Sequence, residues 1–239
     1  PTMAAFFDYD HDGDLDMLLR LNEILNSYHP SVFRPKIHNG THFSTDRLYR
    51  NDWDSKLNHS VFTDVSKEAG ILSEGYGHSV SIADFNKDGY KDIFVTNGYV
   101  KDYTDMDFMR YSMNRLIRSM HKDTFDAVPE YIKKMPTNRI ANYIYQNNGN
   151  ETFTKKTKEW GLDQPGVSSG AAYADLDNDG DLDLVINNSN DYAGIYKNNA
   201  TGILKNNFLR VHLVGNALNE RGIGAKVKLY CKGHLYYQE

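Results

Sequence analysis

The sequence predicts an all-β fold built from repeats. Three observations lead to this prediction: an acidic pattern of nine residues occurs three times, short apolar segments lie on both sides of each copy, and two further kinds of segment recur in a fixed order. Short apolar segments bounded by turn residues are typical of strands. A pattern that recurs at long intervals indicates a repeat architecture, in which each repeat is one supersecondary unit.

The acidic pattern is clearest in residues 175–183, which read Asp-Leu-Asp-Asn-Asp-Gly-Asp-Leu-Asp. Aspartate stands at every odd position, and the glycine at position 6 permits a sharp turn. Carboxylates at this density repel one another unless a cation neutralises them, and Ca²⁺ takes about six to eight oxygen ligands. The predicted ligands are the side chains of Asp175, Asp177, Asp179 and Asp183 (positions 1, 3, 5 and 9) and the backbone carbonyl of Asp181 (position 7).

Two further copies of the pattern cover residues 8–16 and 84–92. The ligand positions are Asp8, Asp10, Asp12, Asp14 and Asp16 in the first acidic loop, and Asp84, Asn86, Asp88, Tyr90 and Asp92 in the second. The side chain at position 7 differs among the copies, which fits a backbone ligand. The sequence therefore predicts about three Ca²⁺ ions, one in each acidic loop. The second site is expected to bind less tightly, because Asn86 replaces an aspartate and ligand charge tunes affinity.

The surroundings of the loops exclude an EF-hand. An EF-hand has a glutamate at position 12 and a helix on each side, whereas position 12 here is Leu19, Val95 or Ile186. The flanking segments read as strands. They are residues 3–7 and 15–19 around the first loop, 79–83 and 93–96 around the second, and 170–174 and 182–186 around the third. Each acidic loop is therefore predicted to join two strands.

Two other segments recur between the loops. Residues 48–52, 144–148 and 195–199 each place an aliphatic residue and a tyrosine before an asparagine-containing turn, and residues 62–71 and 153–162 both begin with Phe-Thr and end at a glycine turn. The predicted order is aromatic strand, turn, Phe-Thr strand, turn and calcium hairpin, so residues 1–20 are interpreted as the second half of a repeat. About four strands per unit fits a blade of a β-propeller.

The acidic loops begin at residues 8, 84 and 175, which is farther apart than a bare blade of about 40–50 residues allows. The larger insert, about residues 104–135, is predicted to be helical because its apolar residues recur at spacings of three and four. These residues are Met106, Met109, Met113, Leu116 and Met120. Residues 1–204 are assigned to propeller blades. Residues 205–239 are assigned to the beginning of a C-terminal β module, because residues 206–215 and 222–230 alternate as strands do.

Composition restricts the possible partners. The chain of 239 residues has a formal net charge of −5, and the acidic loops hold 13 of its 32 acidic residues. Three bound Ca²⁺ ions would offset this charge. No clustered basic stripe is present, so a nucleic-acid partner is not predicted. No run of 18 apolar residues is present, so no transmembrane segment is predicted. Cys231 is the only cysteine, which excludes an internal disulfide.

The three acidic hairpins resemble the FG-GAP/VCBS repeats of integrin-type β-propellers. Residues 207–215 and 221–227 resemble the start of the ASPIC/UnbV domain, which follows such repeats in cartilage acidic protein-like and UnbV-like proteins. Residues 46–51 resemble the bacterial secreted and surface members. The resemblance implies a seven-bladed propeller of which this chain is a part, a Ca²⁺ ion in each blade that carries the motif, and an extracellular or cell-surface location. It implies no established chemistry.

Two classes of function follow as hypotheses. The first is a non-enzymatic, calcium-stabilised binding or scaffold module whose partner is a polysaccharide, a surface protein or an outer-membrane assembly. It is favoured because all ligands of each site come from one short hairpin, as in a structural site. The second is a polysaccharide-active enzyme similar to propeller lyases, for which His78 and Tyr173 are the candidate residues because they lie just before acidic loops. No nucleophile triad, phosphate loop or zinc motif appears, so no catalytic residue is assigned.

Overall fold

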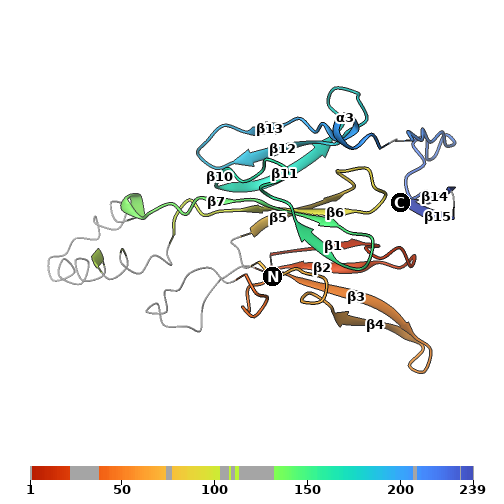
Figure 1. The fold of residues 1–239 in the computed structure, drawn as a ribbon, viewed down its shortest axis with the longest axis horizontal. Helices are drawn as coiled ribbons and strands as arrows, with labels where there is room; N and C mark the ends of the chain where they lie inside the picture. The colour runs from red at the N-terminus through yellow and green to blue at the C-terminus, as the bar shows by residue number, and fades with distance from the viewer. Residues whose placement is uncertain are drawn as a thin grey trace.

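The structure is a computed structural model that describes residues 2–21, 38–73, 77–102, 108, 111–112, 132–206, 209–231 and 233–238. Three antiparallel sheets follow one another along the chain and stack in the same order (Figure 1). The first sheet has the order β1-β2-β3-β4 and consists of β1 (Met3–Phe7), β2 (Asp16–Arg20), β3 (Arg47–Asp54) and β4 (His59–Asp64). The first acidic loop joins β1 to β2.

The second and third sheets repeat this plan. The second has the order β5-β6-β8-β9 and consists of β5 (Gly77–Ala83), β6 (Asp92–Asn97), β8 (Tyr143–Asn147) and β9 (Phe153–Lys155). The third consists of β11 (Ser168–Ala174), β12 (Asp183–Asn188) and β13 (Gly194–Tyr196), and is followed by the short helix α3 (Ala200–Leu204). A two-residue pair, β7 (Ile140–Ala141) with β10 (Pro165–Gly166), lies beside them. The flanking segments of all three acidic loops are thus strands, as predicted.

The core lies between the stacked sheets. Every residue of β6 is buried, and its side chains alternate between the two faces of the sheet, as in any strand. Ile93 and Val95 join an apolar cluster with residues of the first sheet, whereas Phe94 joins a cluster with residues of the third. Strand β5 contacts both β1 and β11, so the first strand of each sheet adjoins the first strand of the next. This all-β arrangement is propeller-like, because the innermost strands of successive blades meet around an axis.

The repeat seen in the sequence and the sheet seen in the structure begin at different strands. Residues 1–20, interpreted as the second half of a repeat, contribute β1 and β2, which are the first two strands of a complete four-stranded sheet. Strand β2 continues the sheet by pairing with β3, where Met17 lies opposite Tyr49. The first and second sheets each have a long insert, and both inserts lie between the second and third strands of their sheet: β2 and β3 in the first, β6 and β8 in the second.

The predicted helical insert lies almost entirely outside the described residues, including its stripe of Met106, Met109, Met113, Leu116 and Met120. Of the predicted span, the structure describes residues 108, 111–112 and 132–134 as helical. At the base of the insert, the backbones of Tyr99 and Asn138 form an isolated antiparallel bridge.

The C-terminal segment differs from the prediction. The expected strand over residues 206–215 is wrong for residues 209–215, which have no regular structure. Their alternating side chains remain outside the core, with Leu209 and Val214 65% and 83% exposed, and no neighbouring strand pairs with them among the described residues. The second expected strand begins only at Val227 and forms a hairpin of β14 (Val227–Cys231) and β15 (His234–Gln238). None of the helices among the described residues is long and apolar enough to cross a membrane.

Candidate metal centre

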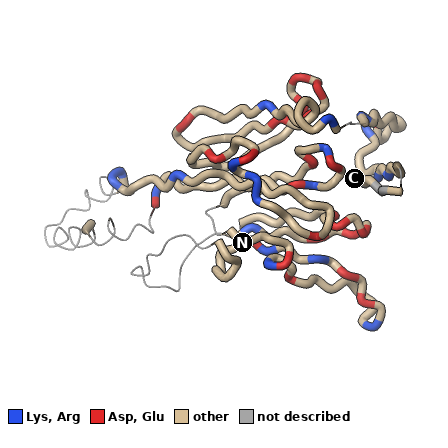
Figure 2. Tube along the Cα trace, in the orientation of Figure 1, with Lys and Arg blue, Asp and Glu red and all other residues tan. Residues whose placement is uncertain are grey.

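The acidic loops follow β1, β5 and β11, and they lie at the same end of the three stacked sheets. Figure 2 shows acidic residues at these loops as well as elsewhere along the chain. Contacts between successive loops confirm that they are neighbours, because the rings of His11 and Tyr90 stack and the side chains of Lys87 and Asp181 form an ion pair. The repeated strands therefore bring three similar acidic loops into one row.

The backbone of each loop folds its carboxylates inward. The residue at position 4 is left-handed in all three loops, with φ of 66° at His11, 59° at Lys87 and 64° at Asn178. The glycine at position 6 then has φ of 98°, 96° or 87°, a region that residues with a Cβ rarely adopt. This turn points the glycine N–H at the carboxylate of position 1, with N···O distances of 3.2, 2.8 and 3.2 Å in the three loops.

Two loops group three carboxylates at one point. In the first loop, Asp8, Asp10 and Asp16 each place an oxygen within 4.8 Å of the others, and in the third loop Asp175, Asp177 and Asp179 do the same. The second loop holds no such group among the described residues. There the amide of Asn86 donates to Asp88 across 2.7 Å, so an amide replaces one carboxylate.

Unpaired oxygens in the first and third loops are compatible with a bound cation. The position-1 oxygens Asp8 Oδ1 and Asp175 Oδ1 are buried and accept no hydrogen bond, and Asp14 Oδ1 is in the same state. A buried carboxylate oxygen without a partner is costly. An all-oxygen donor set of carboxylates, one amide and backbone carbonyls is the set that hard divalent cations such as Ca²⁺ prefer. The residues present therefore fit the predicted ion.

The aspartate at position 9 also accepts backbone hydrogen bonds, which its spacing in the sequence does not reveal. Asp16 is fully buried, and its two oxygens accept the backbone N–H groups of Tyr9 (3.0 Å) and Asn51 (2.9 Å). The equivalent aspartates, Asp92 and Asp183, accept the same two kinds of N–H group. Position 9 thus fastens the loop to the third strand. Because each carboxylate oxygen has about two lone pairs, it can do so and still face a cation.

At position 7 the side chains of the second and third loops contact neighbouring residues, whereas the Asp14 side chain of the first loop keeps a buried, unpaired oxygen. Asp181 accepts hydrogen bonds from the backbone and hydroxyl of Thr201 and pairs with Lys87. Burial raises the pKa of the Asp181 carboxyl, but the hydrogen bonds from Lys87 and Thr201 outweigh this effect and hold the pKa below its usual range. Tyr90 stacks on His11. In these two loops the backbone carbonyl is therefore the group that position 7 can offer to a cation.

Burial among like charges raises the pKa of several loop carboxyls. Desolvation is the largest cause of the raised pKa of each carboxyl, and repulsion from neighbouring aspartates raises it further. The pKa rises to about 6 for Asp10 and Asp84, to about 7 for Asp16 and to about 8 for Asp92. A bound cation would oppose these shifts, since an adjacent positive charge favours the ionised carboxylate.

The stability of the metal-free protein is therefore expected to depend on pH. The pKa values of Asp16 and Asp92 are higher in the folded chain than the ordinary value of 3.8, so their protonated forms favour folding at low pH, and this contribution is lost as pH rises through about 7 to 8. With Ca²⁺ the trend should reverse, because the ion binds the ionised form. Thermal unfolding between about pH 5 and pH 8.5, with and without Ca²⁺, checks this. A calcium-induced shift of the midpoint that is equal at all pH values would contradict it.

The third loop also has basic neighbours. Lys197 pairs with Asp177 and lies 3.3 Å from Asp179, and Arg210 pairs with Asp175. The hydrogen bond from Lys197 lowers the pKa of the Asp177 carboxyl. Both basic side chains are more than half exposed, and exposed ion pairs contribute little to stability.

Three equivalent asparagines in the third strands or directly after them donate side-chain hydrogen bonds to the acidic loops, and two of them bind a neighbouring loop. Asn147, fully buried, donates from Nδ2 to the backbone carbonyl of Tyr9 in the preceding loop (2.9 Å). Asn198 donates in the same way to Phe85 (2.7 Å), and Asn51 donates to Leu15 in its own loop (3.2 Å). The sequence shows these asparagines as a repeated turn signal, but only the structure shows that Asn147 and Asn198 reach across blades.

Replacing Asn147 by alanine should destabilise the protein by about 2 kcal/mol, because the buried carbonyl of Tyr9 loses its partner. The neighbouring Asn148 is exposed, so Asn148→Ala is the matched control and should change stability by about 0.5 kcal/mol or less. Urea unfolding measures both. Equal effects of the two substitutions would show that the contact between blades is unimportant.

The two candidate catalytic residues do not share a site. His78 lies near the start of β5, where its Nε2 is 2.6 Å from the carbonyl oxygen of Gly98. Tyr173 lies near the end of β11 and packs edge-on against Phe85. Both strands run toward their acidic loops. His78 lies six residues before the start of its loop and Tyr173 lies two residues before the start of its own, so the two residues are offset by about 13 Å along the strands. The structure therefore brings together no acid–base pair from them.

A cavity of about 430 Å³ lies between the second and third sheets, beside the third acidic loop. Its lining is mostly apolar and includes Phe85, Trp160 and Tyr196. Two charged residues, Glu159 and Lys197, are also among its lining residues. Mostly apolar concave surfaces with a few polar groups are the usual form of ligand pockets.

Comparison with protein families identifies two repeats in this chain. Residues 76–105 match the FG-GAP repeat, and residues 136–186 match an FG-GAP-like repeat. The second match starts before β8 and ends within β12, so it crosses from the second sheet into the third. The family's sequence repeat thus has the same offset from the sheets as the repeat described above.

Comparison with curated proteins finds distant similarity to cartilage acidic protein 1. The chain is 28% identical over 242 residues to the protein of Xenopus tropicalis, covering 90% of this chain and 35% of that protein. It is 26% identical over 198 residues to the human protein, covering 72% of this chain and 29% of that protein. The chain thus spans about a third of the length of these relatives.

Proposed function

We propose that this chain is part of a non-enzymatic, calcium-stabilised binding or scaffold module that works outside the cell or at its surface. The observation that carries the proposal is the pair of buried, unpartnered carboxylate oxygens on Asp8 and Asp175, each inside a folded acidic loop. FG-GAP repeats, which the chain contains, suggest an extracellular binding or adhesion-type module. A plentiful extracellular ion also suits sites of about 10⁻⁴–10⁻³ M affinity.

In this proposal the ligands are the fifteen residues predicted from the sequence, five in each acidic loop. Ca²⁺ would supply charge neutralisation and a fixed turn. The chain's own residues do the rest: the position-6 glycine amide orients the position-1 carboxylate, and the position-9 aspartate ties the loop to the third strand. The second loop is the weakest site, because Asn86 stands at position 3 and its amide is occupied by Asp88.

The enzymatic alternative has less support. His78 and Tyr173 lie at opposite ends of neighbouring strands, and the acidic groups of the loops are already assigned to the proposed metal sites or to structural hydrogen bonds. The relatives carry the name cartilage acidic protein 1, which describes no reaction. Polysaccharide cleavage therefore remains a second outcome of the binding experiment below.

We also propose that residues 205–239 begin an ASPIC/UnbV-type module, and that the protein is of the bacterial secreted or surface type. The support for the module is the resemblance of residues 207–215 and 221–227 to that domain, and the support for the bacterial type is the resemblance of residues 46–51. The hairpin of β14 and β15 adds a separate small sheet after the last propeller-like strands. The complete protein would then place calcium-bearing blades next to this module.

The partner we propose is a polysaccharide held at the cavity between the second and third sheets, where Trp160 and Tyr196 offer aromatic surface. A panel of purified polysaccharides, assayed with Ca²⁺ and with EDTA, tests this. We expect calcium-dependent retention that Trp160→Leu abolishes, whereas Trp53→Ala, a change at an exposed tryptophan outside the cavity, leaves it intact. Retention that survives Trp160→Leu would exclude the cavity. Release of shortened chains would favour the enzymatic alternative.

A further inference from the structure

Neighbouring acidic loops touch through the same two positions at both junctions. Between the first and second loops, the ring of His11 at position 4 stacks on Tyr90 at position 7, with centroids 4.4 Å apart and planes inclined by 13°. Between the second and third loops, Lys87 at position 4 pairs with Asp181 at position 7. One contact is a ring stack and the other an ion pair, yet both join position 4 of one loop to position 7 of a neighbouring loop. We therefore attribute the contact to the geometry of successive blades, and we call it the loop link.

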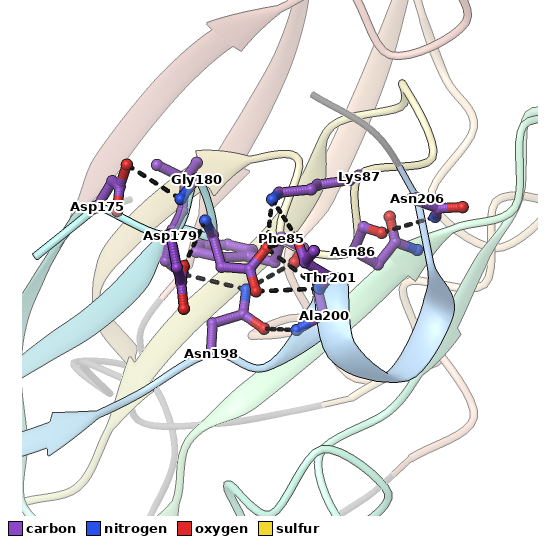
Figure 3. Close-up of polar contacts among 12 residues, drawn as sticks. Phe85, Asn86, Lys87, Asp175, Asp179, Gly180, Asn198, Ala200, Thr201 and Asn206 are labelled. Carbon is purple, nitrogen blue, oxygen red and sulfur yellow. Dashed lines mark hydrogen bonds and ion pairs between the residues drawn. The ribbon is translucent and has the colours of Figure 1, made fainter. Parts of the chain in front are cut away.

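The loop link between the second and third loops is buried. The side chains of Lys87 and Asp181 are only 8% and 1% exposed. Lys87 Nζ also donates to Thr201 Oγ1 across 2.6 Å, and Thr201 donates from its backbone and its hydroxyl to Asp181. Figure 3 shows Lys87 extending from its own loop to Thr201 in the first turn of α3. A buried charge with several partners is fixed in position, unlike an exposed ion pair.

Both ends of this link lie within predicted metal sites. Lys87 stands between Asn86 and Asp88, which are positions 3 and 5 of the second loop. Asp181 holds Lys87 with its side chain, while its own backbone carbonyl is the predicted position-7 ligand of the third loop. A cation that orders Asp181 therefore also orders the anchor of the turn that carries Asn86 and Asp88. A second cation would then bind a loop whose ordering cost is already lower.

We propose that cation binding at the second and third acidic loops is cooperative, and that the side chain of Lys87 is the positioning group that couples them. The inference rests on the proposed function, since it requires both loops to bind Ca²⁺. It extends that function by making the row of loops a connected unit instead of a set of independent sites. Coupling of this kind is reciprocal, so each loop must change the affinity of the other by the same factor.

Hydrogen–deuterium exchange during a Ca²⁺ titration of the full chain tests the proposal loop by loop. The amide of Gly89, bonded to Asp84, reports on the second loop, and the amide of Gly180, bonded to Asp175, reports on the third. Disabling the third loop with Asp175→Ala and Asp179→Ala should shift the calcium midpoint of the second loop upward by about fivefold or more. In the Lys87→Met background the same change should cause no shift.

Lys91→Met is the matched control. It removes an equal charge from the same loop, at position 8, which is not a predicted ligand. The shift should persist in this background. The reverse experiment, in which Asp84→Ala and Asp88→Ala disable the second loop, should raise the midpoint of the third loop by the same factor. This arm does not depend on the folding of the Lys87 variant.

Each outcome decides something. A shift of equal size with Lys87 and with Met at that position, or no shift in either direction, would overturn the coupling while leaving calcium binding in place. Protection that does not respond to Ca²⁺ in either loop would overturn the proposed function together with the coupling. The failure of one proposal is therefore distinguishable from the failure of the other.

Discussion

Removal of calcium is expected to lower the midpoint of thermal unfolding by many degrees. A ligand that binds only the folded state stabilises it by about 2.7 kcal/mol when its concentration is a hundred times Kd, so three filled loops would contribute roughly 8 kcal/mol. The physical origin is the set of buried carboxylates, because their mutual repulsion and their unpaired oxygens destabilise the metal-free fold. Scanning calorimetry with excess EDTA and then with excess Ca²⁺ measures the difference.

The variant Asp175→Ala with Asp179→Ala is the control for this experiment. It removes two ligands from one loop, so it should lose at least about a third of the calcium-dependent shift. Asp52→Ala, at an exposed acidic residue outside the loops, should keep the whole shift. If EDTA and Ca²⁺ give the same midpoint in the unaltered protein, the aspartates form a bare acidic edge and have no role in stability through metal binding.

Asp46→Ala is expected to be the most damaging single substitution outside the acidic loops, at about 3–5 kcal/mol. Arg20 at the end of β2 is completely buried and pairs with Asp46, which is 3% exposed. Asp46 also accepts the backbone N–H of Leu21 at 3.0 Å, and Arg20 donates to Asn97 in the second sheet at 2.9 Å. Without Asp46, a buried guanidinium keeps its charge and loses its counterion.

Glu151→Ala is the matched control for Asp46→Ala. Glu151 pairs with Arg50 at the surface, where both side chains are substantially exposed, so its loss should cost less than about 1 kcal/mol. Replacing both members of the buried pair, with Arg20→Met and Asp46→Leu, should recover part of the loss because no unpaired charge remains. Guanidinium unfolding distinguishes these cases. Comparable costs for Asp46→Ala and Glu151→Ala would rule out an essential buried pair.

The acidic loops could be predicted from sequence because their geometry is local. Nine consecutive residues contain the carboxylates and the glycine turn, and the strands follow directly on each side, so spacing alone assigns positions 1 to 9. The same reasoning assigned position 7 to a backbone carbonyl, and the structure shows Tyr90 and Asp181 with their side chains engaged by neighbouring loops. The structure of such a short pattern can be predicted from its spacing, because it does not depend on residues far away in the sequence.

Features that depend on distant parts of the chain were not predictable in this way. Arg20 and Asp46 are separated by an insert, and nothing in their spacing identifies a buried pair. The sequence shows Lys87 only as a basic residue between two predicted ligands of the second loop, whereas in the structure its amine pairs with Asp181 of the third loop. The segment 209–215 has the alternation of a strand, but a strand forms only where a partner edge is present, and no strand in the part of the chain that the structure describes pairs with it.

The most direct test of the central claim is the number of Ca²⁺ ions bound by the folded protein. Equilibrium dialysis with an ion count should find three ions held by these loops. The pairs Asp8→Ala with Asp12→Ala, Asp84→Ala with Asp88→Ala, and Asp175→Ala with Asp179→Ala should each remove one ion. A count that stays the same in all three variants, or a folded protein that binds no Ca²⁺, would contradict the assignment of these loops as metal sites.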